Sequence, residues 1–534
     1  MCDSPKLYCF LDLGFAPPSD AILTADELRE PELLFPLKVM QCEECGLTQL
    51  SYSVNRLLLY GKKYKYEASI TTTGKRHFHS MADSICERLK LAKGSLVVDV
   101  GSNVGVLLEG FQKNGMRVLG LEPAPDICKI ANERKIDTLQ EFMGFEVAKR
   151  VLRDYGKAKI VTGTNVFAHV DDKEEFMSAL DVLLDDDGIF VIEAPYFLEL
   201  IENLEYDTIY VEHLEYLSVK PLLRYFNEHA MDIFDVELHE IHGRSIRVFV
   251  CRKGKFPATG TVQAFLDREN QKGIYSRQVL DDFARRVKLH RDTLLGLLWD
   301  LKRRGNRIVG ISAPAKGNTL LNYCRIGPEL IDYLAEKSVI KRGHYSPGMH
   351  IPIVEEQRIY HDRPAFGIIF AWNFADEIMK NNDAYARSGG RFIIPIPEPI
   401  VVTNSSVDDV NVREVNPVHF DDRGSITDVL NETIEHVGLI ETKKGSVRGN
   451  HYHKRSVQHS YLLSGLMEVI ISAGTCPDAR KILLKPGQLI TIPPGRRHSF
   501  KAIEDSVMID LITESRADDG YERDVVRVPF KEAE

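Results

Sequence analysis

Residues 97–105, VVDVGSNVG, decide the fold of the middle of this chain, because they join a strand-like run to a helix through a glycine-containing turn. Gly101 and Gly105 let the backbone turn tightly and approach a ligand closely. The next strand-like run ends in Glu122, about 20 residues further on, where a carboxylate can accept the ribose hydroxyls of an adenosyl group. The stretch therefore predicts a nucleoside-binding turn at the end of a buried strand.

The spacing D-x-G-x-x-x-G from Asp99, with an acid ending the second strand, resembles class I S-adenosylmethionine-dependent methyltransferases. Dinucleotide binding is the nearest alternative, and an ordinary strand–turn–helix without a ligand is the other. Polar groups that follow strand ends carry ligands in open α/β sheets. The resemblance and this rule together imply that S-adenosylmethionine is held by Asp99, Gly101, Gly105, Glu122 and Asn165.

Strands and helices alternate outward from this turn. KIVTGTNVF (159–167) and GIFVIEAP (188–195) are further strands of the same series. A second series begins at RIVGISAP (307–314) and continues through GIIFAWNF (367–374), and a polar stretch near 253–275 is expected to link the two. Such alternation is typical of parallel α/β sheets. After about residue 412 the chain changes to short strands punctuated by glycine and proline, which predicts an all-β barrel or sandwich.

Composition excludes several classes of protein. The chain has 534 residues, of which 44% are hydrophobic and 27% charged, as in ordinary soluble globular proteins. No stretch approaches the ~18 apolar residues of a membrane span, and the start lacks the pattern of a signal peptide. A net charge of −10 argues against a general nucleic-acid binder. We expect a cytoplasmic protein with neither a membrane nor a nucleic-acid partner.

The nine cysteines are too scattered, and odd in number, for a disulfide framework. Cys42 and Cys45 form a C-x-x-C pair, a spacing that suits two thiolates on one tetrahedral metal. Cys2 and Cys9 are the only nearby partners in the sequence. These four cysteines therefore predict a structural zinc site, and a redox pair or a chance spacing is the alternative.

A second group of polar residues lies further along the chain. TGTNVFAHVDD (162–172) places His169 just after a strand, and EYDTIYVEHLEYLS (205–218) packs Tyr210, Glu212 and His213 close together. A base beside a phenol suits removal of a proton next to a carbonyl, with donors to hold the enolate oxygen. The alternative is a partly exposed polar helix start.

Several longer motifs then point to one family. TNVFAHVDD, EAPY, DTIYVEHLEYLS, SAPAKGNTLLNYC, HYSPGMHIPI and AWNFADEI together resemble the sugar C-methyltransferases, over roughly residues 9–402. These enzymes methylate a carbon of a nucleotide-linked 4-keto-6-deoxysugar. The resemblance implies a zinc module, a methyl-donor domain and a second Rossmann-like domain, with the nucleotide sugar in the cleft between them.

The resemblance also implies roles for single residues. His213 is the expected base, Tyr210 and Glu212 hold the sugar and the base, and His169 and Tyr66 face the substrate. Near the diphosphate it places Lys316, Asn318 and Thr319. Two departures stand out: Val211 replaces a histidine of the family pattern, and the first zinc pair is Cys2 and Cys9 instead of a C-x-x-C.

Residues 445–465, GSVRGNHYHKRSVQHSYLLSG, and 487–498, GQLITIPPGRRH, resemble the two motifs of cupin barrels. At the usual metal-ligand positions they carry His451, His453, Gln458 and His498. Glutamine replaces the commoner glutamate and is a weaker ligand, so the presence of a cupin metal stays open.

RGNHYHK and the phrase DDRGSITDV resemble nucleotide-sugar cupins, namely sugar 3,5-epimerases and 3,4-ketoisomerases. That resemblance implies His451 as base, Arg448 as a phosphate or enolate ligand, and Tyr452 or Tyr461 as acid. A cupin kept only for dimerisation or substrate binding is one alternative, and a metal-dependent dioxygenase is another.

We therefore expect a multidomain α/β chain with four parts: a zinc-binding module (1–60), a methyltransferase domain (61–255), a second Rossmann-like domain (256–408) and a cupin barrel (412–534). The predicted enzyme is bifunctional. It methylates an NDP-4-keto-6-deoxysugar, at carbon 3 or else carbon 5, and epimerises a carbon next to the ketone, with ketoisomerisation as the alternative. A homodimer is expected, while the nucleotide, the sugar and the order of the two steps stay open.

Overall fold

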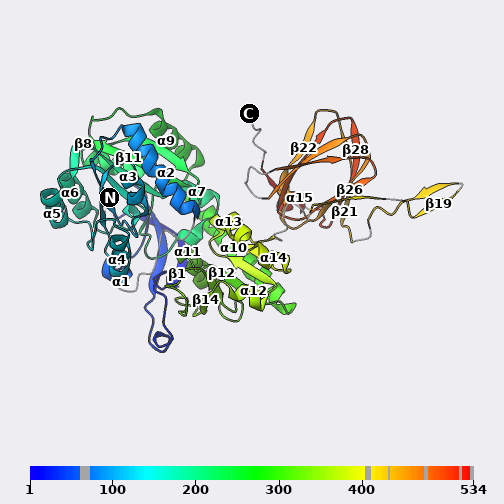
Figure 1. Ribbon diagram of the computed structural model, residues 1–534, viewed down its shortest axis with the longest axis horizontal. Coiled ribbons are helices and arrows are strands. Elements are labelled where there is room, and N and C mark those ends of the chain that lie inside the picture. Colours follow the sequence, from blue (N-terminus) through cyan, green and yellow to red (C-terminus); the bar gives the residue numbers. More distant parts are fainter. Residues whose placement is uncertain are drawn as a thin grey trace. The chain divides into compact units, whose positions relative to one another are not determined.

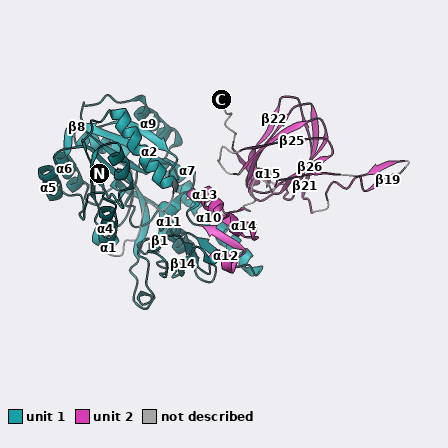
Figure 2. Cartoon of the chain, in the orientation of Figure 1, with its two compact units in different colours: residues 1–358, 370–373 teal, residues 359–369, 374–534 magenta. Residues whose placement is uncertain are grey.

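The computed structural model describes residues 1–60, 72–241, 243–402, 410–415, 417–421, 423–430, 433–473, 479–515, 517 and 520–528. The chain divides into two compact units, which Figure 2 colours separately. Unit 1 comprises residues 1–358 and 370–373, and unit 2 comprises residues 359–369 and 374–534. Within the described part of the chain, no helix has both the length and the apolar character that a membrane crossing requires.

Unit 1 begins with a four-stranded sheet in the order β1-β2-β3-β9. Its strands are β1 (Leu7–Ala16), β2 (Phe35–Cys42), β3 (Thr48–Leu50) and β9 (Glu215–Tyr216). The last of these comes from the segment that contains Tyr210 and His213, far along the chain. Thr48 pairs with Tyr216, and the Leu50 N–H donates to the Leu214 carbonyl at 2.8 Å. The segment around His213 is thus hydrogen-bonded into the N-terminal sheet.

The central sheet of unit 1 has seven strands in the order β10-β11-β8-β7-β4-β5-β6 (Figure 1). They are β4 (Leu96–Val100), β5 (Arg117–Leu121), β6 (Thr138–Leu139), β7 (Ala158–Thr164), β8 (Leu184–Pro195), β10 (Met231–His239) and β11 (Ser245–Arg252). The five strands β4 to β8 are parallel, while β11 and β10 extend the sheet in antiparallel fashion. Every residue of β4 is buried, as expected for a parallel strand covered on both faces.

Helices cover both faces of this sheet. The helices and 3₁₀ turns of the region are α2 (Thr72–Leu89), α3 (Val106–Lys113), α4 (Pro125–Glu133), α5 (Phe145–Tyr155), η2 (Phe167–His169), α6 (Lys173–Leu183), α7 (Phe197–Glu202), η3 (Tyr206–Thr208) and α8 (Val219–Glu228). On one face Phe111 and Ile85 pack with Val97 and Val191. On the other face aromatic rings from η2, α6 and α8 surround Phe190 of β8.

The remainder of unit 1 holds α9 (Gly260–Lys272), α10 (Arg277–Arg303), α11 (Ala315–Cys324) and the parallel strands β12 (Ile308–Ile311), β13 (Leu334–Glu336) and β14 (Ile353–Glu355). The stretch near 253–275, expected as a linker, is largely α9. Only Val262 and Glu269 of this helix are buried, so its polar sequence resembles that of a connecting segment.

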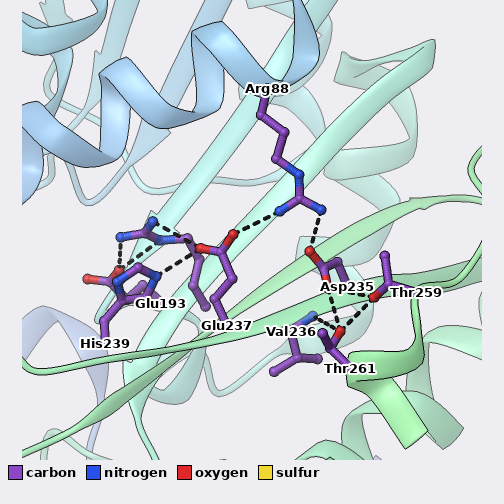
Figure 3. Close-up of polar contacts among 9 residues, drawn as sticks. Arg88, Glu193, Asp235, Val236, Glu237, His239, Thr259 and Thr261 are labelled. Carbon is purple, nitrogen blue, oxygen red and sulfur yellow. Dashed lines mark hydrogen bonds and ion pairs between the residues drawn. The ribbon is translucent and has the colours of Figure 1, made fainter. Parts of the chain in front are cut away.

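A network of charged side chains fixes α2 to the central sheet. Figure 3 shows Arg88 of α2 reaching Asp235 and Glu237 on β10, with the contact to Glu237 Oε1 at 2.8 Å. Deeper in the network, the buried Glu193 of β8 accepts hydrogen bonds from Arg247 at 2.7 and 2.9 Å. Burial opposes ionisation of Glu193, but His77, 2.7 Å from Glu193 Oε1, and Arg247 outweigh it and lower its pKa to about 2.

Unit 2 begins with a small α/β part, made of β15 (Phe366–Ile369), α13 (Ala375–Asn381), α14 (Asp383–Arg387), β16 (Arg391–Ile394) and β17 (Ile400–Val402). The rest of the described chain forms two antiparallel five-stranded sheets, in the orders β18-β26-β23-β28-β21 and β25-β24-β27-β22-β29. Their strands are β18 (Asn411–Glu414), β21 (His436–Thr442), β22 (Val447–His453), β23 (Gln458–Ser464), β24 (Met467–Ala473), β25 (Arg480–Leu484), β26 (Gln488–Ile492), β27 (Arg496–Ala502), β28 (Ser506–Ile512) and β29 (Val525–Arg527).

Apolar side chains from both sheets, among them Leu462, Val469, Ile490 and Phe500, form one core. The change of pattern after residue 412 is thus an all-β domain, as the sequence predicts. A separate hairpin, β19 (His419–Asp421) with β20 (Gly424–Ile426), lies between β18 and β21 in the chain.

Candidate active sites

The glycine-containing turn after β4 has the geometry that its sequence predicts. Gly101 and Gly105 have φ values of +65° and +80°. A Cβ on Gly101 would lie 2.4 Å from Val166 Cγ2, so the turn leaves no room for a side chain. The Thr162 hydroxyl donates to Asp99 Oδ1 at 2.6 Å, and burial raises the pKa of Asp99 to about 7. The turn therefore requires glycine at position 101, and the Asp99 carboxyl group is mostly protonated below pH 7.

Glu122 lies buried beside this turn, at the end of β5. Its Oε2 accepts from the Asn103 N–H at 3.0 Å, and its Oε1 accepts from the Ala124 N–H at 2.9 Å. A carboxylate offers about four lone-pair directions, so two acceptor positions remain for hydroxyl groups. Burial raises the pKa of Glu122, and the two N–H donors oppose that rise. The residue has the chemistry expected of a ribose ligand.

A pocket opens where β7 and β8 end. It is lined by Asn165, Ala168, His169, Ala194, Pro195, Thr208, His213, Glu215 and Tyr216. Two predicted catalytic residues, His169 and His213, thus share one pocket, with ring centroids 4.7 Å apart. Asn165, predicted as a cofactor ligand, is here too; its backbone has φ +55°, and its N–H donates to the Glu193 carbonyl at 2.7 Å.

Hydrogen bonds define the tautomer of His213. Its Nδ1 lies 2.8 Å from the Thr208 carbonyl, which can only accept, so Nδ1 carries the proton. Its Nε2 lies 2.7 Å from the Tyr210 hydroxyl and presents its lone pair there. This neutral imidazole is oriented as a base, with a phenol beside the basic nitrogen.

His169 is held neutral. Its Nδ1 lies 2.7 Å from the Tyr60 hydroxyl, and burial with the charge of Lys173 lowers its pKa to about 3. Its Nε2 is buried and has no partner among the described residues. Tyr60 belongs to no motif, and the sequence does not reveal it. Tyr66, predicted to line the same cleft, lies outside the described residues.

Glu212 is buried, and its Oε1 accepts from the Ser19 N–H at 2.8 Å. Burial and the nearby Asp20 raise its pKa to about 8, so most Glu212 is protonated at neutral pH. Its second oxygen has no partner in the described part of the chain. Protonated, that oxygen is a hydrogen-bond donor.

The three residues predicted near a diphosphate differ in their surroundings. Asn318 Nδ2 donates to the Ser19 carbonyl at 2.5 Å, and the Thr319 hydroxyl donates to the Ile209 carbonyl at 2.9 Å. Thr319 therefore holds the loop that carries Tyr210, and Asn318 holds Ser19, whose N–H donates to Glu212. Lys316 is partly buried; its ammonium nitrogen is buried 4.6 Å from the centroid of the Trp372 ring, and burial lowers its pKa. Of the three, only Lys316 has an unpartnered polar group.

Three of the four predicted zinc ligands cluster. Cys2, Cys42 and Cys45 place their sulfur atoms within 4.8 Å of one another. Burial opposes ionisation of Cys42, but N–H groups of Cys45 and Glu44 donate to its sulfur and lower its pKa. Three thiols so placed suit a tetrahedral zinc. Cys9 is a correction: it lies exposed on β1, with its sulfur 4.0 Å from the Leu11 carbonyl, outside this cluster.

The cysteine cluster is part of the turn between β2 and β3. The Cys42 N–H donates to the Leu47 carbonyl at 2.8 Å, and the Gly46 N–H donates to the Cys42 carbonyl at 2.9 Å. Because β3 pairs with β9, a metal bound here would fix the turn that positions the strand after His213.

The all-β domain brings three histidines together. His451 and His453 lie on β22, His498 lies on β27, and their ring nitrogens lie within 4.8 Å of one another. Burial lowers the pKa of His498 to about 3, and its Nδ1 lies 2.8 Å from the Arg496 carbonyl. The predicted ligand positions therefore share one site inside the domain.

Both ring nitrogens of His453 face oxygen acceptors. Nδ1 lies 2.8 Å from Asp524 Oδ2, and Nε2 lies 2.9 Å from Gln458 Oε1. The orientation of the Gln458 amide is fixed because its Nε2 lies 3.1 Å from Asp510 Oδ2. Both ring nitrogens of His453 are therefore engaged by partners within the domain. Burial opposes ionisation of Asp524, but His453 and Ser456 outweigh it and hold its pKa far below the usual range.

Tyr452 and Tyr461, the two candidate acids of this domain, face away from the histidines, because side chains alternate along a strand. Leu462 of β23 is in the core, so its neighbour Tyr461 points to the opposite face of the strand. Tyr452 likewise alternates with His451 and His453 and faces away from them. Neither tyrosine shares the face of the histidines.

Arg448 does share a face with His451. Arg448 and His451 are three residues apart, a spacing that would place them on opposite faces of a regular strand. A bulge at Asn450, which has φ +57°, shifts the register between Gly449 and His451 and brings them to the same face. The Arg448 guanidinium donates to the Thr442 hydroxyl and the Glu441 carbonyl, each at 3.0 Å.

Comparison with known families agrees with these features. Residues 1–60 match a putative zinc binding domain, 74–231 a methyltransferase domain, 240–397 a C-methyltransferase C-terminal domain and 438–512 a cupin domain. The predicted combination of Rossmann-like methyltransferase parts with a cupin is confirmed.

The chain is 34% identical to the C-methyltransferase NovU of Streptomyces niveus over 397 residues, which cover 74% of this chain and 94% of that protein. An uncharacterized methyltransferase of Alkaliphilus oremlandii is 26% identical over 170 residues, 30% of this chain and 74% of that protein. Among solved structures, the QdtA 3,4-ketoisomerase of Thermoanaerobacterium thermosaccharolyticum is 25% identical over 22% of this chain and 86% of its own, with a TM-score of 0.19.

The cysteine cluster yields a first prediction. Cys45→Ser should lower the zinc content and speed amide hydrogen exchange in residues 210–217, because the β2–β3 turn that orders β9 loses its metal. Exchange in residues 96–105, which lie in the central sheet, should stay unchanged. Mass spectrometry of the exchanged peptides and metal analysis measure both effects.

Cys9→Ser is the matched control and should retain the zinc. Reversible removal of zinc from the unmodified protein with a chelator separates loss of the metal from damage by substitution. Unchanged exchange in residues 210–217 after zinc loss would disprove the coupling.

Proposed function

This chain belongs to the C-methyltransferase family, and on that premise we propose that it methylates a carbon next to the ketone of a nucleotide-linked 4-keto-6-deoxysugar. The observation that carries this proposal is the pocket of His213 and His169, in which one imidazole is set up as a base and the other is neutral. Carbon 3 is our choice for the methylated position, and carbon 5 is the alternative.

His213 Nε2 removes the proton next to the ketone. The hydrogen bond from its Nδ1 to the Thr208 carbonyl stabilises the imidazolium that forms. The enolate oxygen needs donors, and the unpartnered His169 Nε2 and the protonated Glu212 are the available ones. Tyr210 stays close to the base and orients it.

S-adenosylmethionine, when bound, supplies an electrophilic methyl group. The glycines at positions 101 and 105 let the backbone approach the cofactor closely. Glu122 has acceptor positions left for the ribose hydroxyls. Lys316, whose ammonium is buried and unpartnered, is the group we assign to the diphosphate of the sugar nucleotide.

We expect His213→Asn to lower kcat for methyl transfer by about 10²- to 10⁴-fold, the usual contribution of a general base. Binding of S-adenosylmethionine should be unchanged, because His213 lies outside the glycine turn. Mass spectrometry of the product, together with calorimetry of cofactor binding, tests both statements on a dTDP-linked 4-keto-6-deoxyglucose.

His229→Asn is the matched control, since His229 follows the end of α8, contacts Glu174 and does not line the pocket. Full methylation by the His213→Asn variant would refute the proposed base.

For the cupin we propose acid–base chemistry on a carbon next to the same ketone, without a metal. His451 acts as base, and His453, whose ring is held by Asp524 and Gln458, returns a proton. We favour epimerisation, in which the proton returns to the carbon that lost it. In 3,4-ketoisomerisation, the alternative, the proton is delivered to a different atom of the sugar. A cupin that only binds substrate is the competing function.

Metal analysis and one substitution test this second site. The purified chain should hold one zinc, removed by Cys45→Ser, and no second stoichiometric metal. His451→Asn should abolish inversion or isomerisation of the sugar nucleotide in proton NMR while leaving methylation intact. A redox-active metal lost in His451→Asn would instead establish a dioxygenase-like cupin, and unchanged sugar chemistry would reduce the domain to a binding module.

We also propose a homodimer formed through the cupin. Strand β21 is an edge strand whose outward side chains Val437 and Leu439 are exposed. Among the described strands, β19 and β20 pair only with each other, and Ile426 of β20 and Val418, just before β19, are exposed. An isolated hairpin and an open apolar edge are both unstable in water, and a second copy would cover both.

A further inference from the structure

Lys173 occupies an unexpected place for a lysine. It is the first residue of α6, where the helix dipole disfavours a positive charge, yet its side chain is only 7% exposed. Asp172 already caps this helix by accepting from the Glu175 N–H at 2.9 Å. Neither helix formation nor the surface explains a lysine here, so its burial needs another reason.

The ammonium group closes the turn that carries His169. Lys173 Nζ donates to the Phe167 carbonyl at 3.2 Å and to the Val170 carbonyl at 2.8 Å. These two carbonyls flank His169 on either side. The same nitrogen lies 5.0 Å from the centroid of the Phe167 ring. The backbone around His169 is therefore bound to one cation.

The third partner of the ammonium group comes from the other catalytic segment. Lys173 Nζ lies 2.9 Å from Glu215 Oε2, and the Glu215 side chain is 12% exposed. Glu215 is two residues after His213 and lines the pocket, whereas Lys173 does not line it. The ammonium group thus donates to two carbonyls and forms an ion pair with one carboxylate.

We propose that Lys173 is a positioning residue for methyl transfer, which binds the turn of His169 and the strand of His213 to a single ammonium group. The inference rests on the proposed function of these two histidines. Their rings come from separate elements, and their 4.7 Å separation depends on how those elements are joined. Glu215 is the partner through which Lys173 acts on His213.

The charge of Lys173 supports the same role. It adds to burial in lowering the pKa of His169, which keeps that imidazole neutral. A neutral His169 can donate from Nε2 without competing with His213 for the substrate proton. Position and charge therefore favour the same arrangement of base and donor.

Lys173→Met is the decisive variant, because methionine preserves the apolar stem and removes the charge and the donors. We expect kcat for methyl transfer to fall about 10- to 100-fold, as misplacement by about 1 Å can cause. Binding of S-adenosylmethionine should change less than about twofold, because the glycine turn is not involved. Added Glu215→Gln should recover part of the loss, because it removes the carboxylate left unpaired.

Titration of His169 gives a readout that a purely structural role would not move. In the unmodified protein its ¹⁵N imidazole signals should stay those of a neutral ring down to low pH. In Lys173→Met its pKa should rise, since one of the two causes that lower it is gone. Lys173→Arg, which keeps the charge, should leave this titration close to that of the unmodified protein.

Lys157→Met is the matched control. Lys157 also donates to two carbonyls, of Val182 and Leu184, at 2.9 and 3.2 Å, but away from the pocket. Equal losses of activity in both variants, or an unchanged kcat and His169 titration in Lys173→Met, would overturn the proposal. If the unmodified protein does not methylate the sugar nucleotide, the proposed function fails, while the titration still tests whether Lys173 controls His169.

Discussion

The pairing of β3 with β9 is the constraint on which the methyltransferase pocket depends. It hydrogen-bonds the strand after His213 to a turn shaped by Cys42 and Cys45, although the two segments lie far apart in sequence. From the other side, Lys173 binds the same strand to the turn of His169. A zinc module with no part in the chemistry thereby becomes part of the frame that orients the base.

Burial gives this pocket its electrostatic character. His169 stays neutral and Glu212 is mostly protonated at neutral pH, because each is withdrawn from water. In the reaction that we propose, these uncharged donors act on the developing enolate in a low-dielectric site. In the cupin, by contrast, a buried carboxylate lies beside a histidine: His453 Nδ1 is 2.8 Å from Asp524 Oδ2.

Motifs of neighbouring residues predict much of this fold, but they do not predict contacts between segments that lie far apart in the sequence. The glycine turn and the joint pocket of His169 and His213 follow from motifs, because strand ends of a parallel sheet meet at one edge. Cys9 and Tyr461 are misplaced by sequence reasoning because the face a strand residue occupies depends on register. The role of Lys173 is not predicted, because no motif spacing links it to the segments that it contacts.

Proton exchange in heavy water tests the central claim, that His213 forms an enolate, without methyl transfer. The sugar nucleotide is incubated with S-adenosylhomocysteine and the His451→Asn variant, in which the cupin is silent, and followed by proton NMR. We predict deuterium at one carbon next to the ketone, and none when His213→Asn is added. Exchange that persists in the double variant would contradict the account.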